Sequence, residues 1–223
     1  MRSQFRLAVL ALGLACTRAV RTAPPVNTAE TAVAPDAVAD TLLTDVRALD
    51  STIVVELRYA TSNNFTGAPL PGYLANRAFL RREAAAALVQ VQRDLKEQGL
   101  GIKIFDSYRP VRATNAMVDW THRVHREDLL TDGYIASRSR HNLGVAIDLT
   151  LIELATRREL EMGTPFDTFS AAAHTGNATG IAAMNRQRLK AAMERRGFAN
   201  YDQEWWHYTY DVPNPVRMDK PIR

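Results

Sequence analysis

Two short motifs contain the residue types of a catalytic metal site. The first runs from Ser139 to Asp148 and reads Ser-Arg-His-Asn-Leu-Gly-Val-Ala-Ile-Asp, with Gly144 between His141 and Asp148. Asp148 stands in an apolar stretch typical of a strand, where an ionised carboxylate is costly to bury unless it is paired or bound to a metal. A tight turn at Gly144 would bring the imidazole and the carboxylate to one point.

The second motif, Glu204-Trp-Trp-His207, adds another imidazole and another acid. Two imidazoles and one carboxylate leave a zinc ion a fourth position for water, as catalytic zinc sites do. Glu204 would then take a proton from that water, whose pKa falls to about 7 on zinc. Each motif alone also fits a structural role: a core histidine, an Asp–Arg ion pair or a buried Trp pair. The two together favour a metal site.

The composition limits the other classes of function. The chain has 223 residues, of which 46% are hydrophobic and 23% charged, which suits one apolar core. The formal net charge is +4, with basic residues scattered along the chain, so the sequence does not indicate a nucleic-acid partner. The single cysteine excludes an intramolecular disulfide and a multi-cysteine zinc site. Any metal must therefore be held by histidines and carboxylates.

Hydrophobic periodicity predicts the elements that position these motifs. Helices and strands are mixed without regular alternation, which favours an α+β fold, a single domain with a central, mostly antiparallel sheet flanked by helices. We expect strands over residues 51–59, 102–105, 145–152 and 205–210, and helices over 77–98, 111–124 and 180–196.

The N-terminus has the pattern of an export signal. Two arginines precede the uncharged run Leu7–Ala15, which is too short to span a membrane. Cys16 ends that run, and the pattern resembles a bacterial lipoprotein signal, in which this cysteine is lipidated; removal of the cysteine by ordinary signal peptidase is the alternative. Residues 17–40 are rich in Ala, Thr and Pro and predict a disordered leader after the signal peptide, residues 1–16. The folded domain is expected over residues 41–223.

The motifs together resemble the zinc peptidases grouped with D-Ala-D-Ala carboxypeptidases, lysostaphin-type enzymes and hedgehog domains. Within that group the sequence is similar to the D-alanyl-D-alanine dipeptidases, the family that includes the vancomycin-resistance dipeptidase. The similarity covers roughly residues 45–212. It is carried by Tyr59-Ala-Thr-Ser-Asn-Asn-Phe-Thr-Gly67, Asp106-Ser-Tyr-Arg-Pro110, Met162-Gly-Thr-Pro-Phe-Asp167 and Glu204-Trp-Trp-His-Tyr208, besides the Ser139–Asp148 motif.

This resemblance implies a role for each matching residue. One Zn²⁺ would be bound by His141, Asp148 and His207, in a cleft on the sheet, with Glu204 as general base and then general acid. Further residues would complete the site: Arg109 to stabilise the oxyanion, Asp167 to bind the α-amino group of the dipeptide, Ser139 and Tyr134 to line the pocket, and Asp106 to support Arg109 from behind.

The resemblance implies zinc-dependent hydrolysis of D-alanyl-D-alanine in peptidoglycan turnover, and the N-terminus implies export to the periplasm or cell envelope. The dipeptide is the expected partner, and a lipid anchor at Cys16 would be the one contact with a membrane. Two alternatives remain open. One is a peptidoglycan D,D-carboxypeptidase or endopeptidase on the same fold, and the other is a non-catalytic, zinc-stabilised module that binds cell-wall peptide.

Overall fold

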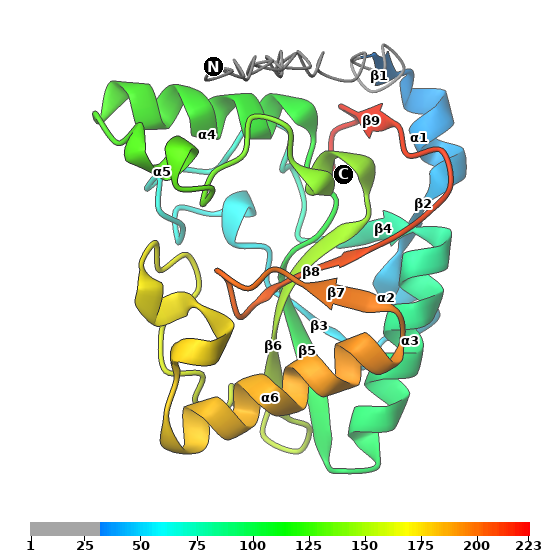
Figure 1. Ribbon diagram of the computed structural model, residues 1–223. Helices are drawn as coiled ribbons and strands as arrows, with labels where there is room; N and C mark the ends of the chain where they lie inside the picture. The colour runs from blue at the N-terminus through cyan, green and yellow to red at the C-terminus, as the bar shows by residue number, and fades with distance from the viewer. Residues whose placement is uncertain (1–31) are drawn as a thin grey trace, which may run out of the picture.

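A computed structural model describes residues 32–223 and shows a mixed α+β fold built on a five-stranded sheet (Figure 1). The strand order is β3-β5-β6-β8-β7. The sheet strands are β3 (Val54–Val55), β5 (Leu100–Asp106), β6 (Ala146–Glu153), β7 (Phe198–Asn200) and β8 (His207–Tyr210). Neighbouring strands are antiparallel except β3 and β5, which run parallel. The predicted α+β class is correct, and the sheet is mixed because the short β3 joins it in the direction of β5.

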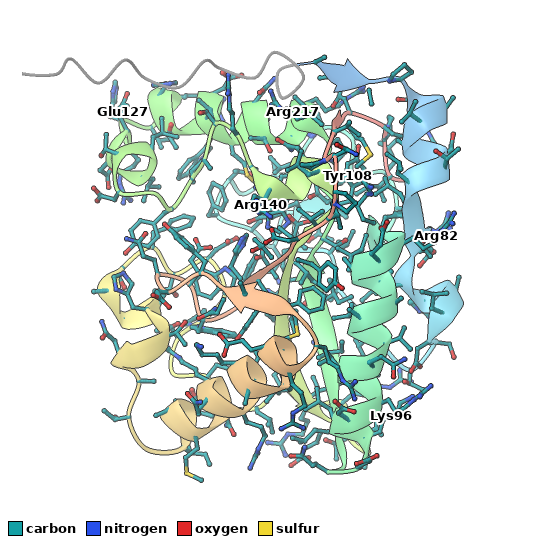
Figure 2. The ribbon with its side chains drawn as sticks, turned by 45° about the vertical axis from the view of Figure 1, so that its right-hand side comes forward. Arg82, Lys96, Tyr108, Glu127, Arg140 and Arg217 are labelled. Carbon is teal, nitrogen blue, oxygen red and sulfur yellow. The ribbon has the colours of Figure 1, made fainter. Side chains whose placement is uncertain are left out.

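Three longer helices accompany the sheet. They are α3 (Arg82–Lys96), α4 (Val111–Arg123) and α6 (Gly180–Arg195). Helices α3 and α6 contact each other and pack on the sheet, α3 on β5 and α6 on β6 and β7. The outer side of α3 carries Arg82 and Lys96 at its opposite ends (Figure 2), while Leu88, Val91 and Leu95 are fully buried on its inner side. This amphipathic spacing is the reason that the sequence predicted the helix.

Two small sheets and short helices complete the described chain. The sheets pair β1 (Val33–Ala34) with β9 (Arg217–Met218), and β2 (Leu43–Asp45) with β4 (Phe79–Arg81). The short helices are α1 (Asp36–Leu42), α2 (Val46–Leu49), α5 (Asp128–Thr131) and four 3₁₀ turns, Arg58–Ala60, Arg140–Leu143, Ala171–Ala173 and Thr175–Asn177. No helix in residues 32–223 combines the length and apolar character that crossing a membrane requires.

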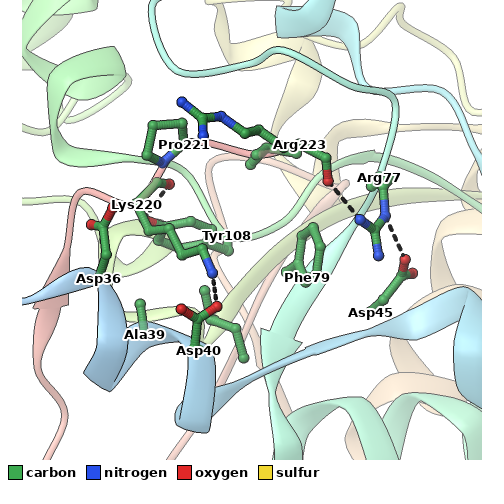
Figure 3. Close-up of a pocket in the computed structure, with 12 residues that line it drawn as sticks. Asp36, Ala39, Asp40, Asp45, Arg77, Phe79, Tyr108, Lys220, Pro221 and Arg223 are labelled. Atoms are coloured by element: carbon green, nitrogen blue, oxygen red, sulfur yellow. Dashed lines mark hydrogen bonds and ion pairs between the residues drawn. The ribbon is translucent and has the colours of Figure 1, made fainter.

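The folded region begins earlier than the predicted boundary at residue 41. Strand β1 pairs with β9 near the other end of the chain, and Ala39 of α1 is fully buried. Asp40 forms an ion pair with Lys220 across a cavity of about 540 Å³ between α1 and the C-terminal segment (Figure 3). The low aromatic content and the Ala-, Thr- and Pro-rich composition of residues 17–40 predict a leader, but pairing of β1 with the distant strand β9 orders the segment from residue 33 onward. The predicted signal peptide and residues 17–31 lie outside the described residues.

Some of the predicted elements have different boundaries in the structure. The expected helix 77–98 begins only at Arg82, since Phe79–Arg81 pair with β2. The expected strand 51–59 is reduced to Val54–Val55 and runs into the 3₁₀ turn at Arg58. The final strand begins at His207, and Trp205 and Trp206 are buried in the preceding turn. At Arg82 a tertiary partner, rather than local periodicity, thus sets the boundary.

Candidate active site

The register of the central sheet aligns three candidate residues in one row. Asp106 of β5 is opposite Asp148 of β6, and Asp148 is opposite His207 of β8. Directly opposed residues point to the same face, with their Cβ atoms about 5 Å apart. Along β6, Ile147 and Leu149 belong to the apolar core, so Asp148 between them points to the opposite face.

The 3₁₀ turn before β6 brings His141 to the same place. Ser139 caps this turn by accepting a hydrogen bond from the His141 backbone N–H at 3.2 Å, and Gly144 ends it in the left-handed region at φ 67°. The left-handed conformation favours glycine here, and a Cβ at Gly144 would also displace the end of the Leu43 side chain, which would lie 2.7 Å away. The predicted turn at Gly144 is therefore present, and it directs the imidazole of His141 toward β6.

His141, Asp148 and His207 form a compact donor cluster. Each residue offers one donor atom, and the three donor atoms lie within 4.8 Å of one another. Nδ1 of His207 lies 2.9 Å from Oδ1 of Asp148 and 3.2 Å from Nε2 of His141. Nδ1 of His141 lies 2.6 Å from the carbonyl oxygen of Ser107. An Nδ1–H that donates to this carbonyl leaves the Nε2 lone pair directed into the cluster, as metal-binding histidines require.

The protonation of the cluster suits a cation. Burial lowers the pKa of His207, which favours the neutral imidazole that can donate a lone pair. Burial alone would raise the pKa of Asp148, but His141 and His207 outweigh it and hold that pKa below its ordinary value. The cluster therefore offers a carboxylate, the neutral imidazole of His207 and the imidazole of His141, a donor set that fits a divalent metal ion.

Glu204 lies at the edge of the cluster. Its Oε2 is 3.8 Å from Nδ1 of His207, and the residue is 8% exposed. Burial raises its pKa well above the ordinary value, and the negative charges of Asp148 and Asp167 raise it further. Glu204 thus has a strong affinity for a proton and is placed beside the metal-binding donors.

Arg109 is held at the opposite side of the cluster by Asp106. Its Nε donates to Oδ2 of Asp106 at 2.9 Å, and Nη2 lies 3.9 Å from Oδ2 of Asp148. Burial opposes the charged guanidinium, but Asp106 and its other neighbours raise the pKa of Arg109 well above its ordinary value. Its positive charge is therefore permanent and fixed in direction, with Asp106 as its buried ion-pair partner.

Asp167 approaches the cluster from a separate loop. Its carboxylate accepts hydrogen bonds from the Tyr59 hydroxyl at 3.0 and 3.2 Å. Arg186 of α6 fixes this loop, since its guanidinium donates to three backbone carbonyls, those of Met162, Ala172 and His174. Burial, and then the charge of Asp148, raise the pKa of Asp167 well above its ordinary value.

These side chains share one cavity of about 390 Å³. Of the predicted site residues within 32–223, all except Asp106 line it: Arg109, Tyr134, Ser139, His141, Asp148, Asp167, Glu204 and His207. Asp106 is fully buried behind Arg109. Tyr134 lies on the cavity wall, and its hydroxyl is 3.2 Å from Nε2 of His174. Cys16 is outside the described residues.

Sequence reasoning gave no role to several residues that the structure places here. Tyr59 contacts Asp167, Phe65 lines the cavity, and Tyr73 donates to Asp106 at 2.6 Å. Tyr59 and Phe65 stand in a segment that carried the family resemblance, which was the one available signal. Tyr73 had no sequence signal, because its contact with Asp106 depends on how the loop before β4 folds over β5.

Comparisons with known proteins agree on one family. The sequence profile of the D-ala-D-ala dipeptidase family matches residues 39–219. A D-alanyl-D-alanine dipeptidase of Enterococcus faecium is 38% identical over 186 residues, which cover 75% of this chain and 92% of that protein. The D-alanyl-D-alanine dipeptidase of Streptomyces coelicolor is 36% identical over 184 residues, 75% of this chain and 91% of that protein.

Similarity to solved structures is lower. One similar structure is the crystal structure of a vancomycin-resistance D,D-dipeptidase in complex with a phosphinate analogue of D-Ala-D-Ala. The alignment covers 63% of this chain and 54% of that chain. The TM-score is 0.40 and the identity 21%.

Proposed function

The chain belongs to the D-alanyl-D-alanine dipeptidase family, and from this premise we propose that it hydrolyses D-alanyl-D-alanine to two molecules of D-alanine. One observation supports this most directly. The sheet register and the Gly144 turn bring the donor atoms of His141, Asp148 and His207 within 4.8 Å of one another. Glu204, Arg109 and Asp167 line the same cavity. A proton acceptor, a fixed cation and a second carboxylate thus surround a metal-binding cluster.

The metal that we propose is Zn²⁺, held by Nε2 of His141, a carboxylate oxygen of Asp148 and Nδ1 of His207. Two imidazoles and one carboxylate are a ligand set of catalytic zinc sites. When bound there, zinc would supply Lewis acidity, which lowers the pKa of water and polarises a carbonyl group. The hydrogen bond from Nδ1 of His141 to Ser107 orients that imidazole for the task.

Glu204 would act as general base and then as general acid. It would take a proton from the attacking water and deliver it to the nitrogen of the leaving D-alanine. Its raised pKa suits this double role, because a catalytic group works best when its pKa lies near the working pH.

Arg109 would stabilise the negative charge that develops on the carbonyl oxygen during attack. Asp106 holds the guanidinium in place before the substrate arrives, so its charge needs no reorganisation during the reaction. The cation–π contact with the ring of Tyr59, 5.0 Å from the guanidinium carbon, restricts it further.

Asp167 would bind the α-ammonium group of the dipeptide. Tyr59 donates to Asp167 in the lining of the cavity, and Ser139 and Tyr134 line it as well. A carboxylate that pairs with a free α-ammonium favours substrates without a preceding residue, which would give the enzyme a preference for dipeptides.

Hydrolysis assays separate this proposal from the two alternatives. The purified protein with Zn²⁺ should release D-alanine from D-Ala-D-Ala, and release from a stem pentapeptide should be far slower. A preference for the pentapeptide would instead support a carboxypeptidase or endopeptidase. Binding of D-Ala-D-Ala without release of D-alanine would support the non-catalytic module.

We also propose export to the periplasm or cell envelope, where the enzyme would act on D-Ala-D-Ala released in peptidoglycan turnover. The support is the sequence pattern of two arginines, the run Leu7–Ala15 and Cys16. Fractionation of expressing bacteria should place the protein outside the cytoplasm. Mass spectrometry should then find either a lipid on Cys16 or a shorter chain that lacks it, and an intact N-terminus in the cytosol would contradict export.

A further inference from the structure

A second cavity lies next to the active-site cavity, and the two have a wall in common. The second cavity has a volume of about 860 Å³ and extends under the loop of residues 158–167. Phe65 and Asp167 line both cavities, and no other residue in the described range 32–223 does so. These two side chains therefore stand between the active site and a larger space.

Phe65 is fixed in this wall by other aromatic rings. Its ring packs edge-on against Trp120 of α4 at a centroid distance of 5.0 Å, and against Phe169 at 5.1 Å. Tyr59 contacts Phe65 at 6.0 Å and also donates to Asp167. The wall is thus a packed aromatic structure, attached by a hydrogen bond to the carboxylate beside it.

The backbone at Asp167 is in an unusual conformation. Its φ is 60°, in the left-handed region that residues other than glycine rarely adopt. Such strain persists where the surroundings hold it, and it is concentrated at functional sites. Here Tyr59 holds the carboxylate at the wall, so a substrate ammonium bound by Asp167 would have its nitrogen next to Phe65.

We propose that Phe65 sets the length of the substrate by closing the passage from the ammonium end of the active site to the second cavity. This inference rests on the proposed function. A residue attached to the amino group of D-Ala-D-Ala must extend about 3.5 Å beyond Asp167, into the position of this wall. The space behind the wall is sufficient, because its volume of 860 Å³ exceeds the 390 Å³ of the cavity that would hold the dipeptide.

The test is a gain of activity in Phe65→Val and Phe65→Ala. The measured quantity is kcat/KM for Gly-D-Ala-D-Ala divided by kcat/KM for D-Ala-D-Ala, each with Zn²⁺. In the extended peptide, water adds to the carbonyl carbon of the D-Ala–D-Ala bond, the C–N bond breaks, and D-alanine leaves with the proton, so the products are Gly-D-Ala and D-Ala. The ratio should rise at least tenfold in Phe65→Ala and less in Phe65→Val.

Two controls distinguish the wall from general loosening of the site. Ile135 lines the active-site cavity but not the second cavity and is not one of the rings that hold Phe65, so Ile135→Ala should leave the ratio near that of the wild type. The isomer D-Ala-D-Ala-Gly, extended at the other end, should gain nothing from either Phe65 variant.

Three results would overturn the inference. They are an unchanged ratio in Phe65 variants that still hydrolyse the dipeptide, an equal rise in Ile135→Ala, and efficient cleavage of Gly-D-Ala-D-Ala by the wild type. Phe65→Val, the smaller change, serves for the ratio if Phe65→Ala does not fold. A wild-type protein that binds zinc but does not cleave D-Ala-D-Ala would overturn the proposed function itself, and is thus distinguishable from these results.

Discussion

Tyr73 and Asp106 are joined by a buried hydrogen bond of 2.6 Å, in which the phenol donates to Oδ1 of the carboxylate. The other oxygen of Asp106 accepts from Arg109. Both oxygens of this fully buried carboxylate are therefore engaged, and its plane is fixed. Burial, together with the charge of Asp106, raises the pKa of Tyr73 well above its ordinary value, so the hydroxyl remains a donor at neutral pH.

Removing the Tyr73 hydroxyl should lower kcat, although Tyr73 does not contact the substrate in the proposed site. Tyr73→Phe leaves one oxygen of Asp106 unpaired and frees Arg109 to reorient, so kcat should fall about tenfold, equivalent to about 1.4 kcal/mol. KM should change little, because Tyr73 does not line the cavity. Steady-state kinetics measures both quantities.

Tyr108→Phe is the matched control for this prediction. Tyr108 is also buried, and its hydroxyl donates to the carbonyl of Lys220, away from the cluster. An equal fall of kcat in both variants would show a general effect of losing a buried phenol rather than a role for Tyr73 in positioning Arg109.

Replacing the proposed proton carrier should abolish turnover but keep the metal site. Glu204→Gln preserves the shape of the side chain and removes its basicity, so kcat should fall by a factor of about 10² to 10⁴. The zinc content should remain one ion per chain, because the donors are His141, Asp148 and His207. Metal analysis alongside the kinetics checks both statements, and wild-type activity in this variant would refute the mechanism.

Metal removal should cost both activity and stability. A chelator should abolish hydrolysis and Zn²⁺ should restore it. Free zinc at about 100 times its Kd should raise the free energy of unfolding by about 2.7 kcal/mol over the metal-free protein. His207→Ala should lose the bound ion, whereas His122→Ala, at an exposed histidine outside the cluster, should keep it. Equal zinc content in both variants would place the metal elsewhere.

The stability of the metal-free protein should depend on pH through Asp167. Burial raises the pKa of this carboxyl in the folded state, whereas an unfolded chain loses the proton near pH 3.8. Unfolding above that pH therefore releases a proton, and the stabilisation present at low pH is lost as the pH rises. Asp167→Asn removes this dependence, so its stability relative to the wild type should improve between pH 4 and pH 7. Urea denaturation with chelator present measures the difference, and parallel pH curves would contradict it.

The site could be predicted from the sequence further than the fold could. The ligand-type residues lie in short motifs with fixed spacing, and a local turn at Gly144 accounts for the approach of His141 to Asp148. His207 is distant in sequence, but its place opposite Asp148 follows once both strands are in the same sheet. Periodicity alone does not show that the Ser139–Asp148 and Glu204–His207 motifs form one site. The family resemblance indicates that they do.

What could not be predicted depends on contacts between distant segments. The parallel pairing of β3 with β5 and the pairing of β1 with β9 leave no local pattern in such short strands. Tyr73 illustrates the same limit within the site, since a tyrosine in a loop has no sequence feature that identifies Asp106 as its partner. Phe65 gained its position in the wall through packing against α4 and the loop that contains Phe169.

Asp106, Asp148 and His207 lie in one row across three strands, so the position of the proposed metal ligands depends on how the strands pair. Shifting β8 by one residue against β6 would turn His207 to the opposite face and replace it with a neighbour that cannot bind the ion. A metal ion held by Asp148 and His207 would therefore bind tightly only when β6 and β8 pair in register. Bound zinc would therefore stabilise the correctly paired sheet relative to sheets with a shifted register. The fraction of correctly folded protein would then depend on the zinc concentration during folding.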